Sequence, residues 1–98
     1  MPEFAFAAEL WRWRPQESWH FVTVPEELAD VIRLSSGPPR AFGSVRVEAT
    51  IGDTRWQTSV FPDRRRGTYL LPVKRSVRSA EDLDVDDVVQ VSIRILDR

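Results

Sequence analysis

The residues from Phe42 to Phe61, FGSVRVEATIGDTRWQTSVF, decide the fold. In the first half of this stretch, apolar side chains recur at every second position: Val45, Val47, Ala49 and Ile51. A period of two places these side chains on one face, which predicts a strand over 42–51 with that face buried. Gly52 and Asp53 suit a tight turn, and residues 55–61 continue as a second strand. The stretch therefore predicts a β-hairpin within an antiparallel sheet.

Four further stretches on both sides of this hairpin have the pattern of strands: 4–13, 19–24, 68–73 and 88–96. The first alternates, with Phe4, Phe6, Ala8 and Leu10 on one face and Ala5, Ala7, Glu9, Trp11 and Trp13 on the other. Residues 14–18 contain Pro15, which favours a turn, so we expect 4–13 and 19–24 to pair as another hairpin. In the last strand the residues expected to face inward are Val89, Val91, Ile93 and Ile95.

Two short helices are predicted between the strands. Residues 25–36 begin at Pro25, which is tolerated in the first helical turn, and Leu28, Val31 and Ile32 form an apolar stripe. Gly37 is a candidate left-handed cap, and the prolines after it prevent continuation. Residues 74–80 are long enough for about two turns of helix. The fold class predicted is mainly β: a small, six-stranded, mostly antiparallel barrel whose open ends are capped by two short helices.

Length and composition limit the number of domains, the possible covalent and metal cross-links, and the cellular compartment. The 98 residues are expected to form one domain, 1–98, with a formal net charge of −1. The sequence holds no cysteine, which excludes disulfides and thiolate metal sites. No apolar run is long enough to cross a bilayer, and the start of the chain lacks the pattern of a signal peptide. We expect a cytoplasmic protein that does not bind membranes.

The order of these features resembles a bacterial family, domain of unknown function 1905. The similarity is carried by the opening FAFAAEL at 4–10, WHFVTVP at 19–25, FGSVRV at 42–47 and GTYLLPVK at 67–74. The sequence departs from the family pattern before the last strand, where Asp86-Asp87 stands in place of a Gly-Asp turn. The resemblance implies a double-split β-barrel and no established activity. That fold type is similar to the barrels of AbrB-type and MazE-type transcription factors, which bind DNA.

Aromatic residues are numerous for a chain of this length. The candidate ligand- or partner-binding residues are Trp11, Trp13, His20, Trp56 and Tyr69. Such rings line ligand pockets or stack nucleobases, although aromatic residues on strands also fill cores. Trp11 and Trp13 lie opposite Phe4, Phe6 and Leu10, so one face of this strand must meet a helix, a partner chain or solvent. His20 is the sole histidine, and a structural or solvent-facing role is favoured over catalysis.

Charged residues form two blocks of opposite sign. The basic block, the candidate for binding an anion or nucleic acid, comprises Arg64, Arg65, Arg66, Lys74, Arg75 and Arg78. Cations at the start of a helix oppose its dipole, which indicates that Lys74 and Arg75 serve some purpose such as gripping an anion. The acidic block, 81–87, has only part of a calcium-loop pattern and favours a solvated loop. The two blocks are also candidates for pairing within one chain or across a dimer.

The function favoured by the sequence is a non-catalytic binding or protein-interaction module. The alternative is nucleic-acid or phosphate binding through residues 64–78, although the net charge of −1 counts against nucleic acid. An enzyme that uses His20 with Glu9 across the first hairpin ranks last, because no catalytic motif is present. No cofactor or metal is expected. The sequence leaves the ligand or protein partner unknown and the oligomeric state open between monomer and homodimer.

Overall fold

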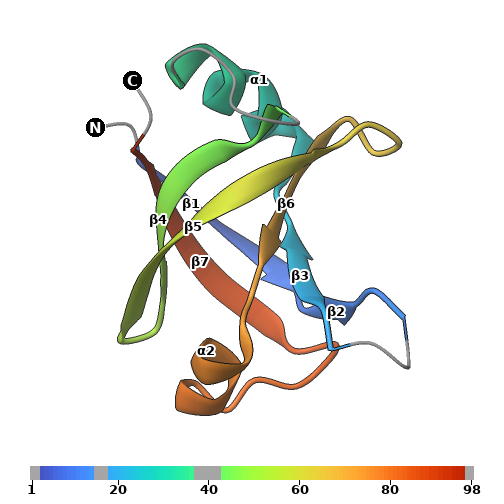
Figure 1. Cartoon of the computed structure of the whole chain (residues 1–98), viewed down its shortest axis with the longest axis vertical. Coiled ribbons are helices and arrows are strands. Elements are labelled where there is room, and N and C mark those ends of the chain that lie inside the picture. Colours follow the sequence, from blue (N-terminus) through green and yellow to red (C-terminus); the bar gives the residue numbers. More distant parts are fainter. Residues whose placement is uncertain (1–2, 15–17, 37–42, 97–98) are drawn as a thin grey trace.

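A computed structural model describes residues 3–14, 18–36 and 43–96 (Figure 1). Along the chain lie β1 (Glu3–Glu9), β2 (Trp11–Arg12), β3 (His20–Thr23), α1 (Glu26–Ser35), β4 (Val45–Ile51), β5 (Thr54–Asp63), β6 (Thr68–Pro72), α2 (Arg75–Ala80) and β7 (Val88–Ile95). The strands pair antiparallel in the order β1-β7-β4-β5-β6-β3-β2. The protein is therefore mainly β, as its sequence predicts.

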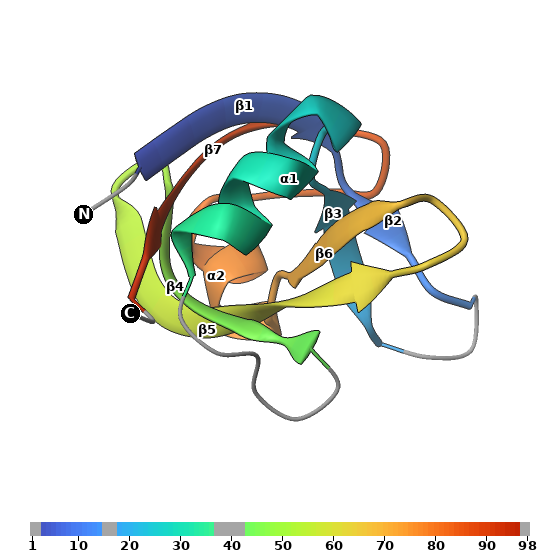
Figure 2. The ribbon, with the colours of Figure 1, turned by 90° about the horizontal axis from the view of Figure 1, so that it is seen from above.

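The sheet curls because one chain segment supplies both of its edges. β1 and β2 are separated only by Leu10, yet they lie at opposite ends of the strand order. Leu10 is fully buried, its N–H donates to the carbonyl of Asp87 (2.9 Å), and its carbonyl accepts from the N–H of Asp86 (2.8 Å). The turn before β7 thus holds Leu10 at the point where the chain stops pairing with β7 and begins to pair with β3. The result is the barrel-like wall in Figure 2.

Two predictions about the first strand are wrong in detail. The sequence predicts six strands, but the described residues hold seven, because the stretch 4–13 is broken at Leu10. The same stretch was expected to pair along its length with 19–24. Instead β1 pairs with β7 over all seven of its residues, and only β2 pairs with β3. Alternation predicts a buried face but not the partner, which here comes from the far end of the chain.

The core lies inside the curled sheet and is closed by the helices. The inward residues predicted for β4 and β7 are all buried, as are Phe6 and Leu10. Figures 1 and 2 show α1 over one end of the wall and α2 at the other. The predicted stripe on α1 needs one correction, since Ala29 and Ile32 are buried whereas Val31 is 44% exposed. The helix cap expected at Gly37 lies outside the described residues.

The wall divides between β5 and β6. β5 pairs with β4 along Thr54–Val60 but with β6 only at Phe61–Asp63. Beyond these three residues the two strands separate, and the chain after β6 turns into α2 (Figure 1). This separation leaves a groove between β5, β3 and α2. Within the described residues, no helix has the length and apolar character needed to cross a membrane.

Candidate functional site

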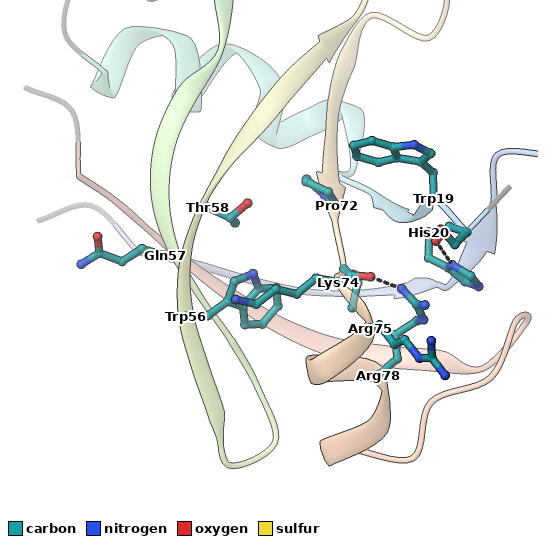
Figure 3. Close-up of a pocket in the computed structure, with 11 residues that line it drawn as sticks. Trp19, His20, Trp56, Gln57, Thr58, Pro72, Lys74, Arg75 and Arg78 are labelled. Carbon is teal, nitrogen blue, oxygen red and sulfur yellow. Dashed lines mark hydrogen bonds between the residues drawn. The ribbon is translucent and has the colours of Figure 1, made fainter.

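The groove between the separated strands, here called the split groove, has a volume of about 340 Å³. Its walls come from three segments: residues 18–20 before and at the start of β3, residues 56–58 of β5, and residues 72–78 from the end of β6 into α2. Figure 3 shows Trp56 on one side of the groove and Trp19 and His20 on the other, with the basic residues between them. Five sequence-predicted candidates meet here: His20, Trp56, Lys74, Arg75 and Arg78.

Backbone pairing and one buried side chain position the basic residues. The N–H of Val73 donates to the carbonyl of His20 (2.9 Å), which ties the end of β6 to the start of β3. Lys74 then precedes the first residue of α2, and Val77, which is 2% exposed, anchors the helix in the core. Because Val77 occupies the inward side of this short helix, the cations around it are left at the surface of the groove.

Arg78 is a partly buried cation at the wall of this groove. Its Nη1 donates to the carbonyl oxygen of Val73 (2.7 Å). Burial lowers the pKa of Arg78, and the positive charge of Arg75 lowers it further, although the guanidinium stays protonated at neutral pH. Among the described residues, none of Lys74, Arg75 and Arg78 forms an ion pair with a carboxylate. The groove therefore concentrates positive charge that an oxyanion would offset.

His20 lines the split groove, and its ring contacts a backbone carbonyl. Its Nδ1 lies 2.8 Å from the carbonyl oxygen of Ser18, so Nδ1–H donates to that oxygen and Nε2 remains to accept. The sequence placed Glu9 across a hairpin from His20, and this expectation is wrong. Glu9 pairs with Val88 of β7, whereas the residue opposite His20 is Arg12. His20 is thus a groove-lining hydrogen-bonding group.

The far end of α2 is tied to the β4–β5 turn. Thr54 Oγ1 donates to Glu81 Oε2 (2.6 Å), and the Glu81 carboxylate lies directly over Gly52. A Cβ on Gly52 would lie 1.9 Å from Glu81 Oε1, and the φ of Gly52 is +58°, a conformation that favours glycine. This contact joins the helix that carries the groove cations to the hairpin that carries Trp56.

A second cluster lies on the outer face of the β2–β3 hairpin. Trp11 faces Phe21 across the strands, and the N–H of Trp13 donates to the carbonyl of Trp19 (2.9 Å). Cross-strand neighbours share a face, so the four rings form one surface, here called the aromatic tile: Trp11, Trp13, Trp19 and Phe21. Its ring centroids are 5.2 Å apart for Trp11 and Phe21, 6.2 Å for Trp19 and Phe21, and 6.4 Å for Trp11 and Trp13. Trp13 and Trp19 are 49% and 58% exposed.

Arginines border the aromatic tile. The guanidinium of Arg66 lies 5.2 Å from the centroid of Trp11, and that of Arg14 lies 5.7 Å from Trp13. Arg66 is held by an ion pair with Asp63. Burial alone would raise the pKa of Asp63, but hydrogen bonds from the side chain of Arg66 and the N–H of Arg65 outweigh it and lower the pKa. Arg64, Arg65 and Arg66 line a shallow groove of about 380 Å³ beside Trp11 and Trp13.

The structure regroups the candidates that the sequence suggested. Trp11 and Trp13 lie with Arg64–Arg66, whereas His20 and Trp56 lie with the cations of residues 74–78. Tyr69 joins neither group, since it is 5% exposed in the core and borders a third pocket. Sequence reasoning missed Trp19 and Phe21 as tile residues. The signal was present, because the two lie two positions apart on one predicted strand and so share a face.

The acidic block does not neutralise the basic loop. Within residues 3–14, 18–36 and 43–96, no ion pair joins 81–87 to Arg64, Arg65 or Arg66. Instead Asp87 forms a turn with Asp84, whose N–H donates to Asp87 Oδ2 (2.8 Å). The same described residues hold no cluster of three or more acidic or imidazole groups suited to a metal ion. The acidic block therefore leaves the charge of the basic loop in place, and the ion pair that the loop forms is the local one between Arg66 and Asp63.

These observations define a class: a small, curled antiparallel β-domain with a basic, aromatic groove where its wall divides. The model of the family named "Domain of unknown function (DUF1905)" matches residues 6–93. The chain belongs to that family, which confirms the resemblance seen in the sequence. Comparison with curated proteins gives no match.

Proposed function

We propose that this protein is a non-catalytic binding module that holds a small molecule through an oxyanion group, a phosphate or a carboxylate, in the split groove. The observation that carries the proposal is that Lys74, Arg75 and Arg78 line one groove and form no ion pair with a carboxylate among the described residues. Guanidinium groups pair with phosphate and carboxylate oxygens through two parallel hydrogen bonds, which favours such ligands over halide ions.

The remaining walls suit the rest of a small ligand. Trp56 is half-buried and packs against the core, so it offers a fixed apolar surface, while Trp19 lies on the opposite wall. A volume of about 340 Å³ is at the small end of the range of ligand pockets, which favours a metabolite over a polymer. His20 Nε2 is a further hydrogen-bonding group.

We also propose that the groove belongs to a double-split barrel and that the protein is cytoplasmic. Support for a double-split barrel comes from the separation of β5 and β6 after three paired residues. A chain without cysteine suits a reducing compartment such as the cytoplasm. In this view the division of the wall is the feature that creates the binding site.

The experiment is a titration with inorganic phosphate, pyrophosphate and succinate at constant ionic strength, followed by tryptophan fluorescence and melting temperature. We expect saturable changes with at least one probe, and loss of those changes in the double variant Lys74→Gln/Arg75→Gln. The matched control, Arg33→Gln/Arg55→Gln, removes the same charge from α1 and the β4–β5 hairpin, away from the groove, and should bind as wild type does. Responses that sodium chloride reproduces, or that both double variants lose equally, would overturn the proposal.

A further inference from the structure

The aromatic tile is an exposed surface that the split groove does not explain. Two of its tryptophans are about half exposed, and isolated monomeric domains rarely leave such clustered rings in water. Trp11 and Phe21 are half-buried beneath them, and the indole N–H of Trp11 donates to Thr23 Oγ1 (3.0 Å). This hydrogen bond holds the ring of Trp11, which contacts Trp13 and Phe21, so binding to this part of the tile would cost less side-chain entropy than binding to isolated exposed rings.

The charged side chains around the tile are mostly arginines. Arg14 and Arg66 lie over its rings. Arg64 and Arg65 are exposed in the β5–β6 turn that also carries Arg66. The carboxylate of this turn, Asp63, is already engaged by Arg66 and by the N–H of Arg65. The β5–β6 turn, which carries Arg64, Arg65 and Arg66, reaches β2 through the contact of Arg66 with Trp11. A partner must therefore offer flat apolar faces together with negative charge.

We infer that the aromatic tile binds single-stranded nucleic acid, with unpaired bases stacked on Trp13 and Trp19 and phosphates contacting Arg64 and Arg65. Stacking platforms bordered by cations are the common solution for this ligand, because every base has a flat face and every linkage carries a charge. A duplex fits poorly, since its base faces are hidden within the helix. Apart from Trp19, which also lines the split groove, the tile lies outside that groove, and the inference stands whether or not the groove binds an oxyanion.

A second copy of the chain is a poorer occupant. A symmetric dimer through the tile would bring the same arginine-rich turn of both copies together, and like charges placed opposite each other oppose association. A proline-rich peptide would use the rings but brings no negative charge to Arg64 and Arg65. Single-stranded nucleic acid uses both features.

The test is fluorescence anisotropy with a labelled oligothymidylate of about 12 nucleotides at low salt. We expect binding by the full chain, weaker by about tenfold in Trp13→Ala and nearly restored in Trp13→Phe, which keeps a ring. Trp13 is 49% exposed, so its replacement should leave the fold intact, as a melting curve will show.

A salt series distinguishes phosphate contacts from general charge. The slope of log binding constant against log salt should fall by about 0.7 in Arg65→Gln and stay unchanged in the matched control Arg55→Gln, which removes an arginine from the β4–β5 hairpin. Three results would overturn the inference: no binding at low salt, equal affinity for a duplex of the same length, or a dimer that Trp13→Ala dissociates. Binding of a polyproline peptide without binding of the oligonucleotide would also overturn it.

Discussion

Replacement of Gly52 by alanine tests the contact that holds α2 against the β4–β5 hairpin. Gly52 has a φ of +58°, and a side chain in this left-handed region costs about 1–2 kcal/mol. The new Cβ would also lie 1.9 Å from Glu81 Oε1, so the carboxylate must move. Its displacement breaks the Thr54–Glu81 hydrogen bond, which contributes about 1.5 kcal/mol or more because the acceptor is charged. We expect Gly52→Ala to lower the free energy of unfolding by about 3 kcal/mol.

Gly67 provides the matched control. Its φ is +68°, but no atom lies within 4 Å of the position a Cβ would occupy. Gly67→Ala should therefore lower the free energy of unfolding by about 1–2 kcal/mol, the cost of a side chain at this left-handed φ alone. Urea unfolding of both variants, with unchanged dependence on urea concentration, measures the difference. Repeating Gly52→Ala in a Glu81→Ala background should reduce its cost to that of Gly67→Ala. Equal losses of stability in the two glycine variants would refute a stabilising role for the Thr54–Glu81 contact. The same conclusion would follow if removing Glu81 left the cost of Gly52→Ala unchanged.

Three further predictions concern the fold and its pH dependence. Leu10→Ala should lower the free energy of unfolding in urea by about 2–5 kcal/mol, because Leu10 is fully buried between β1 and β2. The control Leu34→Ala, at a side chain that is 84% exposed, should change it by less than about 0.5 kcal/mol. Similar losses in the two variants would contradict this packing. Asp86 has a φ of 77°, a conformation that favours glycine, so Asp86→Gly should raise the free energy of unfolding by up to about 1 kcal/mol, and a loss would show that its side chain has another role. The lowered pKa of Asp63 means that its ion pair stabilises the fold above the carboxyl's ordinary pKa of 3.8 and is lost as pH falls through the lower folded value; Asp63→Asn should therefore be less stable than wild type at pH 6, and a difference that did not shrink below about pH 4 would count against the pair.

The sequence was most informative where structure is local. The alternation around Gly52 predicted the β4–β5 hairpin, and every residue expected to face inward on β7 is buried. The positions of both helices follow from nearby residues such as Pro25 and are confirmed within about one residue. These features depend on side-chain period and turn chemistry, which neighbours along the chain determine.

Features set by distant contacts were not predictable from these patterns. The break at Leu10 depends on hydrogen bonds to Asp86 and Asp87, more than 70 positions away in the sequence. The split groove depends on the same kind of contact, since the pairing of Val73 with His20 brings the start of β3 beside α2. The sequence therefore supplied most of the candidate residues but assigned Trp11 and His20 to one group, although they lie on opposite faces of the β2–β3 hairpin.

We propose that Lys74, Arg75 and Arg78 bind an oxyanion in the split groove. The most direct test follows the NMR signals of the arginine Nε–H groups, the indole N–H groups and the His20 ring during titration with inorganic pyrophosphate. We predict saturable shifts for Arg75, Arg78, His20 and Trp56, and no change at Arg55 or Arg33. Shifts of similar size at all arginines, or a groove whose signals stay constant while those of Arg64 and Arg65 move, would contradict the assignment of this groove as the binding site.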